Sequence, residues 1–127
     1  MPRLDPLSPE DAAELADLFD GVEDMMGFTP NDGLIMARKP AIARALTDLV
    51  RAIYAPGHVD PGLKRLIGEA ASKAAGCVYC SAHAAFAADR HGVSREKIEA
   101  VWRYQDSPLF SAAERAAIQV AMRAAVT

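Results

Sequence analysis

This sequence of 127 residues contains only two cysteines, few aromatic residues and no long apolar run. A chain of this size buries roughly two thirds of the surface that its unfolded form exposes, so it needs no disulfide to fold. No apolar run approaches the about 18 residues of a membrane-spanning helix, and the first residues lack the apolar stretch of a signal peptide. These absences predict a soluble cytoplasmic protein with no membrane partner.

An excess of basic charge is also missing. The net charge is -3 and the basic residues are scattered along the chain. Binding to nucleic acid or to an anionic membrane needs clustered Lys and Arg, so we expect neither partner. Cytoplasmic thiols are kept reduced, and a cysteine pair there is more often catalytic or metal-binding than a permanent crosslink.

The pattern of the remaining residues is helical. Alanine is abundant, β-branched residues are sparse, and no segment alternates apolar and polar residues as a strand does. Proline and glycine fall between the periodic stretches and not within them. The sequence therefore predicts one all-α domain over residues 1–127, a single helical bundle of about seven helices.

Capping signals divide the chain into these helices. Ser111-Ala112-Ala113-Glu114 is a complete capping box, and Gly76 is suited to end a helix in the left-handed conformation. The predicted helices begin at Ser8, at Thr29-Pro30, at Lys39-Pro40, at Asp60-Pro61, at Cys77, after Ser94 and after Ser111. The last helix still reads as amphipathic at the end of the sequence. We expect either a neighbouring subunit at this end or a shortened form of a longer domain.

The two cysteines, Cys77 and Cys80, are the main candidate for chemistry. A thiol is a nucleophile as its thiolate, and an unperturbed cysteine is only about 3% ionised at pH 7. A helix start after Gly76 favours the thiolate, and His83 lies on the same helical face, where it could take a proton. Glu69 lies on the preceding helix, so its distance from the pair depends on how the two helices pack.

Other interpretations of these residues are open from the sequence. The cysteines could be two buried residues at core spacing, or half of a zinc site, although no second CxxC or HxxxH completes four ligands. His83 could cap a carbonyl, and Glu69 could be a surface carboxylate. Trp102 and Tyr104 read as core or interface aromatics, and His91 as a residue serving the end of its helix.

Three segments around the cysteine pair form a recognisable pattern: Lys64-Arg65-Leu66, Ala70-Ala71-Ser72-Lys73-Ala74-Ala75-Gly76-Cys77-Val78-Tyr79-Cys80-Ser81-Ala82-His83 and His91-Gly92-Val93-Ser94. Together they resemble the carboxymuconolactone decarboxylase-like superfamily, and within it the alkylhydroperoxidase D-like, peroxidase-related branch. The likeness extends to Gly27-Phe28-Thr29-Pro30-Asn31 and to the segment around Ser111, and covers most of the chain.

The resemblance implies an all-helical homo-oligomer and a thiol-dependent peroxidase that uses no metal or other cofactor. Cys80 would attack a small hydroperoxide and Cys77 would resolve it to a disulfide, which an external dithiol reduces. His83 and Glu69 would relay protons. The chain departs from the family twice: the family's histidine usually lies one residue later, and its glutamate lies at the position of Arg65, one helical turn before Glu69.

The sequence is therefore compatible with three functions. The first is a peroxidase that reduces small alkyl hydroperoxides through the cysteine pair. The second is a lactone decarboxylase like the members that name the superfamily, a chemistry with no use for the cysteines. The third is a non-catalytic helical oligomer whose cysteine pair senses oxidation.

Overall fold

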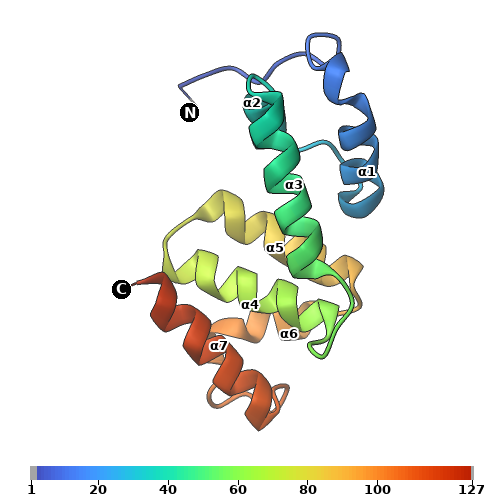
Figure 1. Ribbon diagram of the computed structural model, residues 1–127. Helices are drawn as coiled ribbons and strands as arrows, with labels where there is room; N and C mark the ends of the chain where they lie inside the picture. The colour runs from blue at the N-terminus through green and yellow to red at the C-terminus, as the bar shows by residue number, and fades with distance from the viewer. Residues whose placement is uncertain (1–2, 127) are drawn as a thin grey trace. The chain divides into compact units, whose positions relative to one another are not determined.

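The computed structural model describes residues 3–126 and is built from helices joined by short loops (Figure 1). No strand occurs among these residues. The α-helices are α1 (Ala16–Met26), α2 (Asn31–Met36), α3 (Pro40–Tyr54), α4 (Pro61–Ala74), α5 (Val78–Arg90), α6 (Arg95–Glu99) and α7 (Ala112–Ala125), with short 3-10 helices η1 (Ala13–Leu15) and η2 (Ala100–Arg103). The predicted all-α fold of about seven helices is confirmed.

The helices form two compact units, Met1–Ala55 and Pro56–Thr127, which we describe separately. The assignment of the whole chain to one domain stays a prediction. Among the described residues, no helix has both the length and the apolar character that crossing a membrane requires.

The first unit contains η1 and α1 to α3. Its core is apolar and consists of Ala12, Leu15, Leu18, Phe19, Val22, Ala37 and Ala43. The predicted start of the first helix at Ser8 is wrong. The Ser8 hydroxyl does accept from the Asp11 amide, as a cap would, but it also donates to the Asp11 carboxylate. The chain continues there as turns and η1, since such local bonds offer the backbone an alternative to the helix.

The long helix of this unit, α3, is one of the periodic stretches that the sequence predicted as helical, and it has an apolar face. Ala43 is buried in the core of the unit. Ile42, Leu49 and Ile53 remain more than half exposed, at 60%, 56% and 53%. The periodicity thus predicted the helix correctly but not the burial of its apolar residues.

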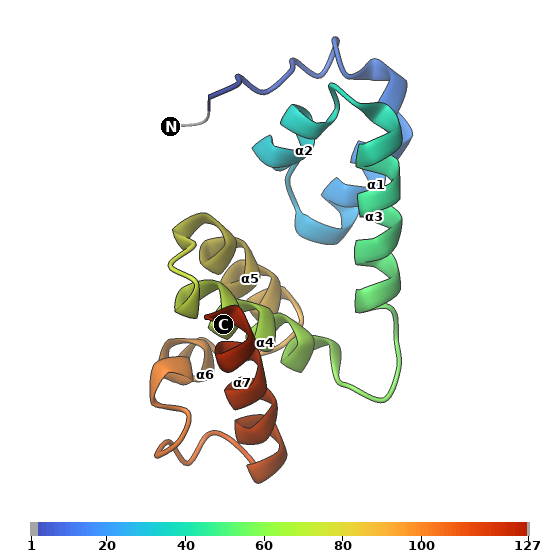
Figure 2. The ribbon, with the colours of Figure 1, turned by 60° about the vertical axis from the view of Figure 1, so that its left-hand side comes forward.

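The second unit is arranged around α4, which packs against α5 and α7 (Figure 2). Its core consists of Leu66, Ala70, Ala88, Ile98, Ala100, Val101, Tyr104, Phe110 and Ile118. Leu66 and Ala70 on α4 belong to this core. Arg65 and Glu69 on the same helix are also buried, at 7% and 1% exposed. The middle of this unit therefore contains two charged side chains.

Candidate functional site

The candidate site begins at the corner between α4 and α5. Gly76 has a φ of 71°, the left-handed conformation that glycine adopts without a steric cost. Its amide donates to the Lys73 carbonyl, and the Cys77 amide donates to the Ser72 carbonyl, each at 2.9 Å. This pair of bonds is the Schellman motif, which ends α4 and turns the chain into the next helix. The prediction that Gly76 separates two helices and puts Cys77 at a helix start is confirmed.

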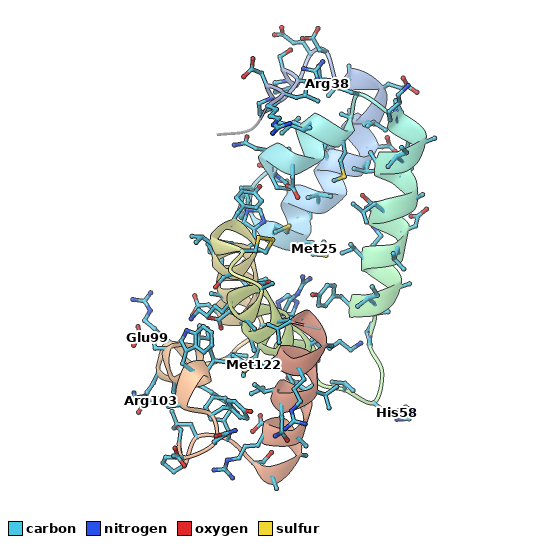
Figure 3. All side chains as sticks on the ribbon, turned by 90° about the vertical axis from the view of Figure 1, so that its left-hand side faces the viewer. Met25, Arg38, His58, Glu99, Arg103 and Met122 are labelled. Atoms are coloured by element: carbon cyan, nitrogen blue, oxygen red, sulfur yellow. A yellow bond between two sulfur atoms is a disulfide. The ribbon has the colours of Figure 1, made fainter. Side chains whose placement is uncertain are left out.

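The structure joins the two cysteines at the N-terminus of α5. Cys77 is the N-cap of this helix, and its Sγ accepts a hydrogen bond from the Cys80 amide at 3.2 Å. A disulfide links Cys77 to Cys80, whose Cα atoms are 5.4 Å apart, and appears as a yellow bond in Figure 3. Cys77 is half-buried and Cys80 is exposed. Amide groups at a helix N-terminus stabilise a thiolate, so the reduced pair stands where thiols are activated.

His83 lies one turn further along α5 and is half-buried. Its ring centroid is 4.2 Å from that of Tyr79, with the two rings tilted by 41°. Tyr79 and Phe86 are each 44% exposed on the same helix. The surface around Cys80 is consequently aromatic, which suits contact with an organic molecule.

Glu69 is a buried carboxylate on α4, with 1% of its surface exposed. Its Oε1 pairs with the Lys73 ammonium at 2.7 Å, one helical turn later. Its Oε2 is also buried but has no hydrogen-bond partner among the described residues. The interpretation of Glu69 as a surface carboxylate is wrong. A buried carboxylate with a spare acceptor oxygen is unusual in a folded protein and calls for an explanation.

One residue beside Glu69, Lys73, was not singled out from the sequence. Lys73 is 27% exposed, and its ammonium lies 5.9 Å from the ring centroid of Trp102 in η2. Trp102, expected as a core or interface aromatic, is 52% exposed and so does not lie in the core, whereas Tyr104 is buried. The spacing of Glu69 and Lys73 by four positions, with the acid first, was a readable signal for their ion pair.

The comparisons with known proteins extend this description. The family model described as "Carboxymuconolactone decarboxylase family" matches residues 40–123. The chain belongs to the carboxymuconolactone decarboxylase family. This match includes both cysteines, His83 and Glu69, and it confirms the resemblance that the sequence suggested.

Two solved structures share the fold of this family member. One is the debrominase Bmp8 with a cysteine replaced by alanine, in complex with 2,3,4-tribromopyrrole, at 36% identity and a TM-score of 0.90. The other is Bmp8 in its apo form, at 37% identity and a TM-score of 0.89. Each alignment covers 98% of this chain and 67% of the other chain. No curated protein in the comparison matches this chain.

Two interpretations of other residues can also be assessed in this family member. Within residues 3–126, no group of three or more His, Cys, Asp and Glu side chains could hold a metal ion, so the half zinc site finds no completing ligands. His91 is the C-cap residue of α5, and its Nδ1 lies 2.7 Å from the Ala87 carbonyl. Its predicted role at a helix end is confirmed.

Proposed function

We propose that this protein is a thiol-dependent reductase that acts as a peroxidase on small organic hydroperoxides. The observation that carries the proposal is the arrangement of the cysteine pair: Cys77 caps α5 with its sulfur, while Cys80 is exposed at the first turn of the same helix. The Cys80 sulfur is therefore accessible to a substrate, while the Cys77 sulfur is close enough to form a disulfide with it.

The first step is an attack by the Cys80 thiolate on one oxygen of the hydroperoxide. The O–O bond breaks, the sulfur becomes a sulfenic acid, and the other oxygen leaves as an alcohol after it takes up a proton. Exposure of Cys80 favours this assignment, since the half-buried Cys77 is harder for a substrate to reach.

The second step closes the disulfide. The Cys77 thiolate attacks the sulfur of Cys80, the S–O bond breaks, and hydroxide leaves as water after protonation. An external dithiol then restores the pair by exchange. We expect it to attack the exposed Cys80 sulfur, because Cys77 is then the leaving thiolate and the helix N-terminus stabilises it.

His83 and Glu69 are the proposed proton carriers. His83 lies one turn after Cys80, so it is suited to take the thiol proton or to protonate the leaving oxygen. Glu69 is proposed to exchange the proton with the site through Oε2, which is buried and has no hydrogen-bond partner in the described part of the chain.

A second candidate is reductive debromination, and the observation that favours it is the likeness to the debrominase Bmp8. The same thiol chemistry would serve. A thiolate takes bromine from carbon, the carbon takes up a proton, and the second thiol displaces bromide as the disulfide forms. The net reaction consumes two thiols and the carbon–bromine compound, and it releases the debrominated compound, bromide and a proton.

The test uses the reduced protein with hydrogen peroxide, tert-butyl hydroperoxide or 2,3,4-tribromopyrrole. Mass spectrometry then follows formation of the Cys77–Cys80 disulfide, with no background from other thiols because the chain has only two cysteines. We expect peroxide to oxidise the wild type, Cys80→Ser to be inert, and Cys77→Ser to stop at a sulfenic acid that dimedone traps.

Each other outcome overturns part of this proposal. Oxidation by tribromopyrrole alone, with bromide released, would establish the debrominase instead. Peroxide oxidation that survives in Cys80→Ser but is lost in Cys77→Ser would reverse the two roles. Decarboxylation of a lactone by a variant without either cysteine would establish the activity of the family's name-giving members.

A further inference from the structure

The ion pair between Lys73 and Glu69 lies directly before the cysteine corner. Lys73 is in the last turn of α4, and its own carbonyl accepts the Gly76 amide in the motif that sets the position of Cys77. One residue thus touches the site twice, through its backbone at the corner and through its ammonium at the Glu69 carboxylate. No motif assigns a role to Lys73.

A buried carboxylate needs compensation, because leaving water costs a charged group far more than a neutral one. The Lys73 ammonium compensates the charge and is bonded to Oε1, whereas Oε2 has no hydrogen-bond partner within residues 3–126. A carboxylate that served only to stabilise the fold would have both oxygens satisfied, as buried polar groups nearly always do. Here only one of the two oxygens is bonded to a described residue.

Lys73 is suited to this task because it spans from the interior to the surface. Glu69 is 1% exposed, whereas the Lys73 side chain is 27% exposed. Its ammonium also lies 5.9 Å from the Trp102 ring centroid, within the range in which a cation is attracted to an aromatic face. Lys73 is thereby oriented from two sides, by a carboxylate within and an indole ring at the surface.

We infer that Lys73 is a positioning residue for the redox site: through its bond to Oε1 it holds the buried Glu69 carboxylate in place, with Oε2 left to exchange a proton with the thiol chemistry. The inference rests on the proposed function, in which Glu69 carries a proton for the cysteine pair. It adds a residue that acts through Glu69 and touches neither substrate nor sulfur.

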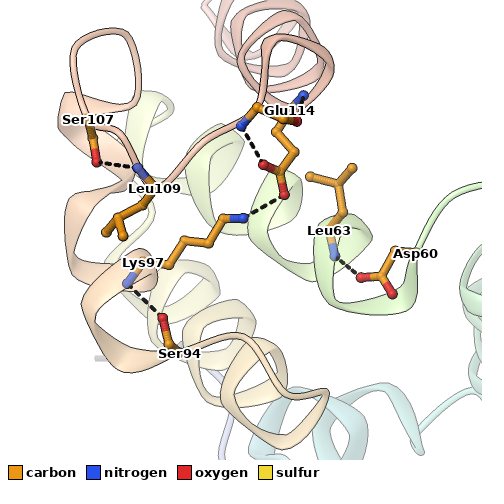
Figure 4. A network of polar contacts seen from close by, with 8 residues as sticks. Asp60, Leu63, Ser94, Lys97, Ser107, Leu109 and Glu114 are labelled. Carbon is orange, nitrogen blue, oxygen red and sulfur yellow. Dashed lines mark hydrogen bonds and ion pairs between the residues drawn. The ribbon is translucent and has the colours of Figure 1, made fainter.

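A second ion pair in the same unit provides a matched control. Lys97 on α6 pairs with Glu114 on α7 at 2.6 Å, and both side chains are 22% exposed (Figure 4). Both Glu114 oxygens are used, since Oε2 accepts the Ser111 amide at 2.8 Å. Lys97→Met therefore removes a lysine from a Lys–Glu pair without touching the proposed relay.

The experiment measures the rate constant for disulfide formation by hydrogen peroxide in reduced variants. We expect Lys73→Met to lower it by about tenfold or more, the lower end of what acid–base groups contribute. Lys73→Arg, which keeps the charge, should recover most of the loss. Glu69→Gln should match Lys73→Met, and Lys97→Met should react like the wild type.

Stability is separated from reactivity by the double variant Glu69→Gln/Lys73→Met. It removes both charges of this ion pair together, so it should regain thermal stability relative to Lys73→Met while its reactivity stays low. Recovery of reactivity together with stability would overturn the inference, as would a Lys73→Met protein that reacts at the wild-type rate. A wild type that fails to react with peroxide would instead overturn the proposed function.

Discussion

Two helix corners of the second unit, at the starts of α5 and α7, each combine an N-cap residue with a nearby Lys–Glu pair, but they differ in which polar groups are hydrogen-bonded. At the start of α7, Ser111 is the N-cap, and the reciprocal bond from Glu114 completes a capping box. At the start of α5 the cap is the sulfur of Cys77, a weaker acceptor. A Lys–Glu pair stands beside each corner, but Glu114 uses both oxygens and the more deeply buried Glu69 uses one.

The difference indicates that the α7 corner stabilises the unit, whereas the α5 corner holds the groups proposed to react. At the α7 corner the Ser111 hydroxyl and both Glu114 carboxylate oxygens are hydrogen-bonded, so these groups stabilise the fold and are not available to a substrate. The α5 corner keeps a spare carboxylate oxygen and a sulfur in place of a hydroxyl. Unsatisfied groups in one corner are tolerable because neighbouring elements, including the α7 corner, are well bonded.

The largest expected contrast between the corners is in the free energy of unfolding of their lysine variants. Lys73→Met leaves the buried Glu69 carboxylate without its ion-pair partner, which should cost about 3 kcal/mol, the lower end of the values for broken buried pairs. Lys97→Met breaks a pair that is partly exposed to water, so it should cost about 1 kcal/mol or less. Urea unfolding of the reduced proteins measures both, and equal costs would remove the distinction between the pairs.

An effect of intermediate size is expected when the two glycines that follow α4 and α5 are replaced by alanine. Gly76 and Gly92 have φ values of 71° and 83°, and an added Cβ would meet no atom within 4 Å at either position. Substitution by alanine should therefore cost about 1 kcal/mol at each site, from the backbone alone.

Reactivity should distinguish these two variants although stability does not. Gly76→Ala disturbs the turn that positions Cys77, so the reaction of the reduced pair with peroxide should slow. Gly92→Ala lies at the far end of α5 and should react like the wild type. Alkylation and peroxide kinetics on both proteins provide the measurement, and an equal effect on the two rates would contradict the account of the corner.

The smallest expected effect concerns pH at the α7 corner. Burial raises the pKa of Glu114, but hydrogen bonds from Lys97 and Ser111 outweigh it, so the pKa lies below its ordinary value of 4.5. A carboxyl with a lowered pKa stabilises the fold fully above its unfolded value and loses that contribution as pH falls through its folded value. Glu114→Gln should therefore be less stable than the wild type at pH 7 by a few tenths of a kcal/mol.

This difference should disappear in acid, once Glu114 of the wild type is protonated in the folded state as well. Urea unfolding of the wild type and Glu114→Gln at pH 7 and at about pH 3 provides the comparison. A gap between the two proteins that persists at the lower pH would show that the glutamate acts through packing and not through its charge.

Much of the fold was predictable because the residues that begin and end a helix interact with residues close to them in the sequence. Asp60, Ser94 and Ser111 each cap a helix where the sequence placed one, through a bond to a residue three positions ahead. The helix start expected at Ser8 was wrong for a reason that is also local: the Ser8 hydroxyl accepts from the Asp11 amide but also donates to the Asp11 carboxylate, and the chain forms turns there.

The candidate site was predictable only in part. The cysteine pair and its helix start follow from adjacent residues, so the sequence located them. The burial of Arg65 and Glu69 depends on α5, η2 and α7 packing around α4, which no local pattern encodes. For the same reason the sequence left open whether Trp102 lies in the core or at an interface; it lies at the surface beside the Lys73 ammonium.

The most direct test of the central claim is the reaction of the fully reduced protein with hydrogen peroxide, followed by mass spectrometry and thiol titration. The account predicts one Cys77–Cys80 disulfide for each peroxide consumed, formed much faster than free cysteine is oxidised at the same pH. A pair that reacts no faster than free cysteine, or that consumes peroxide without forming this disulfide, would contradict it.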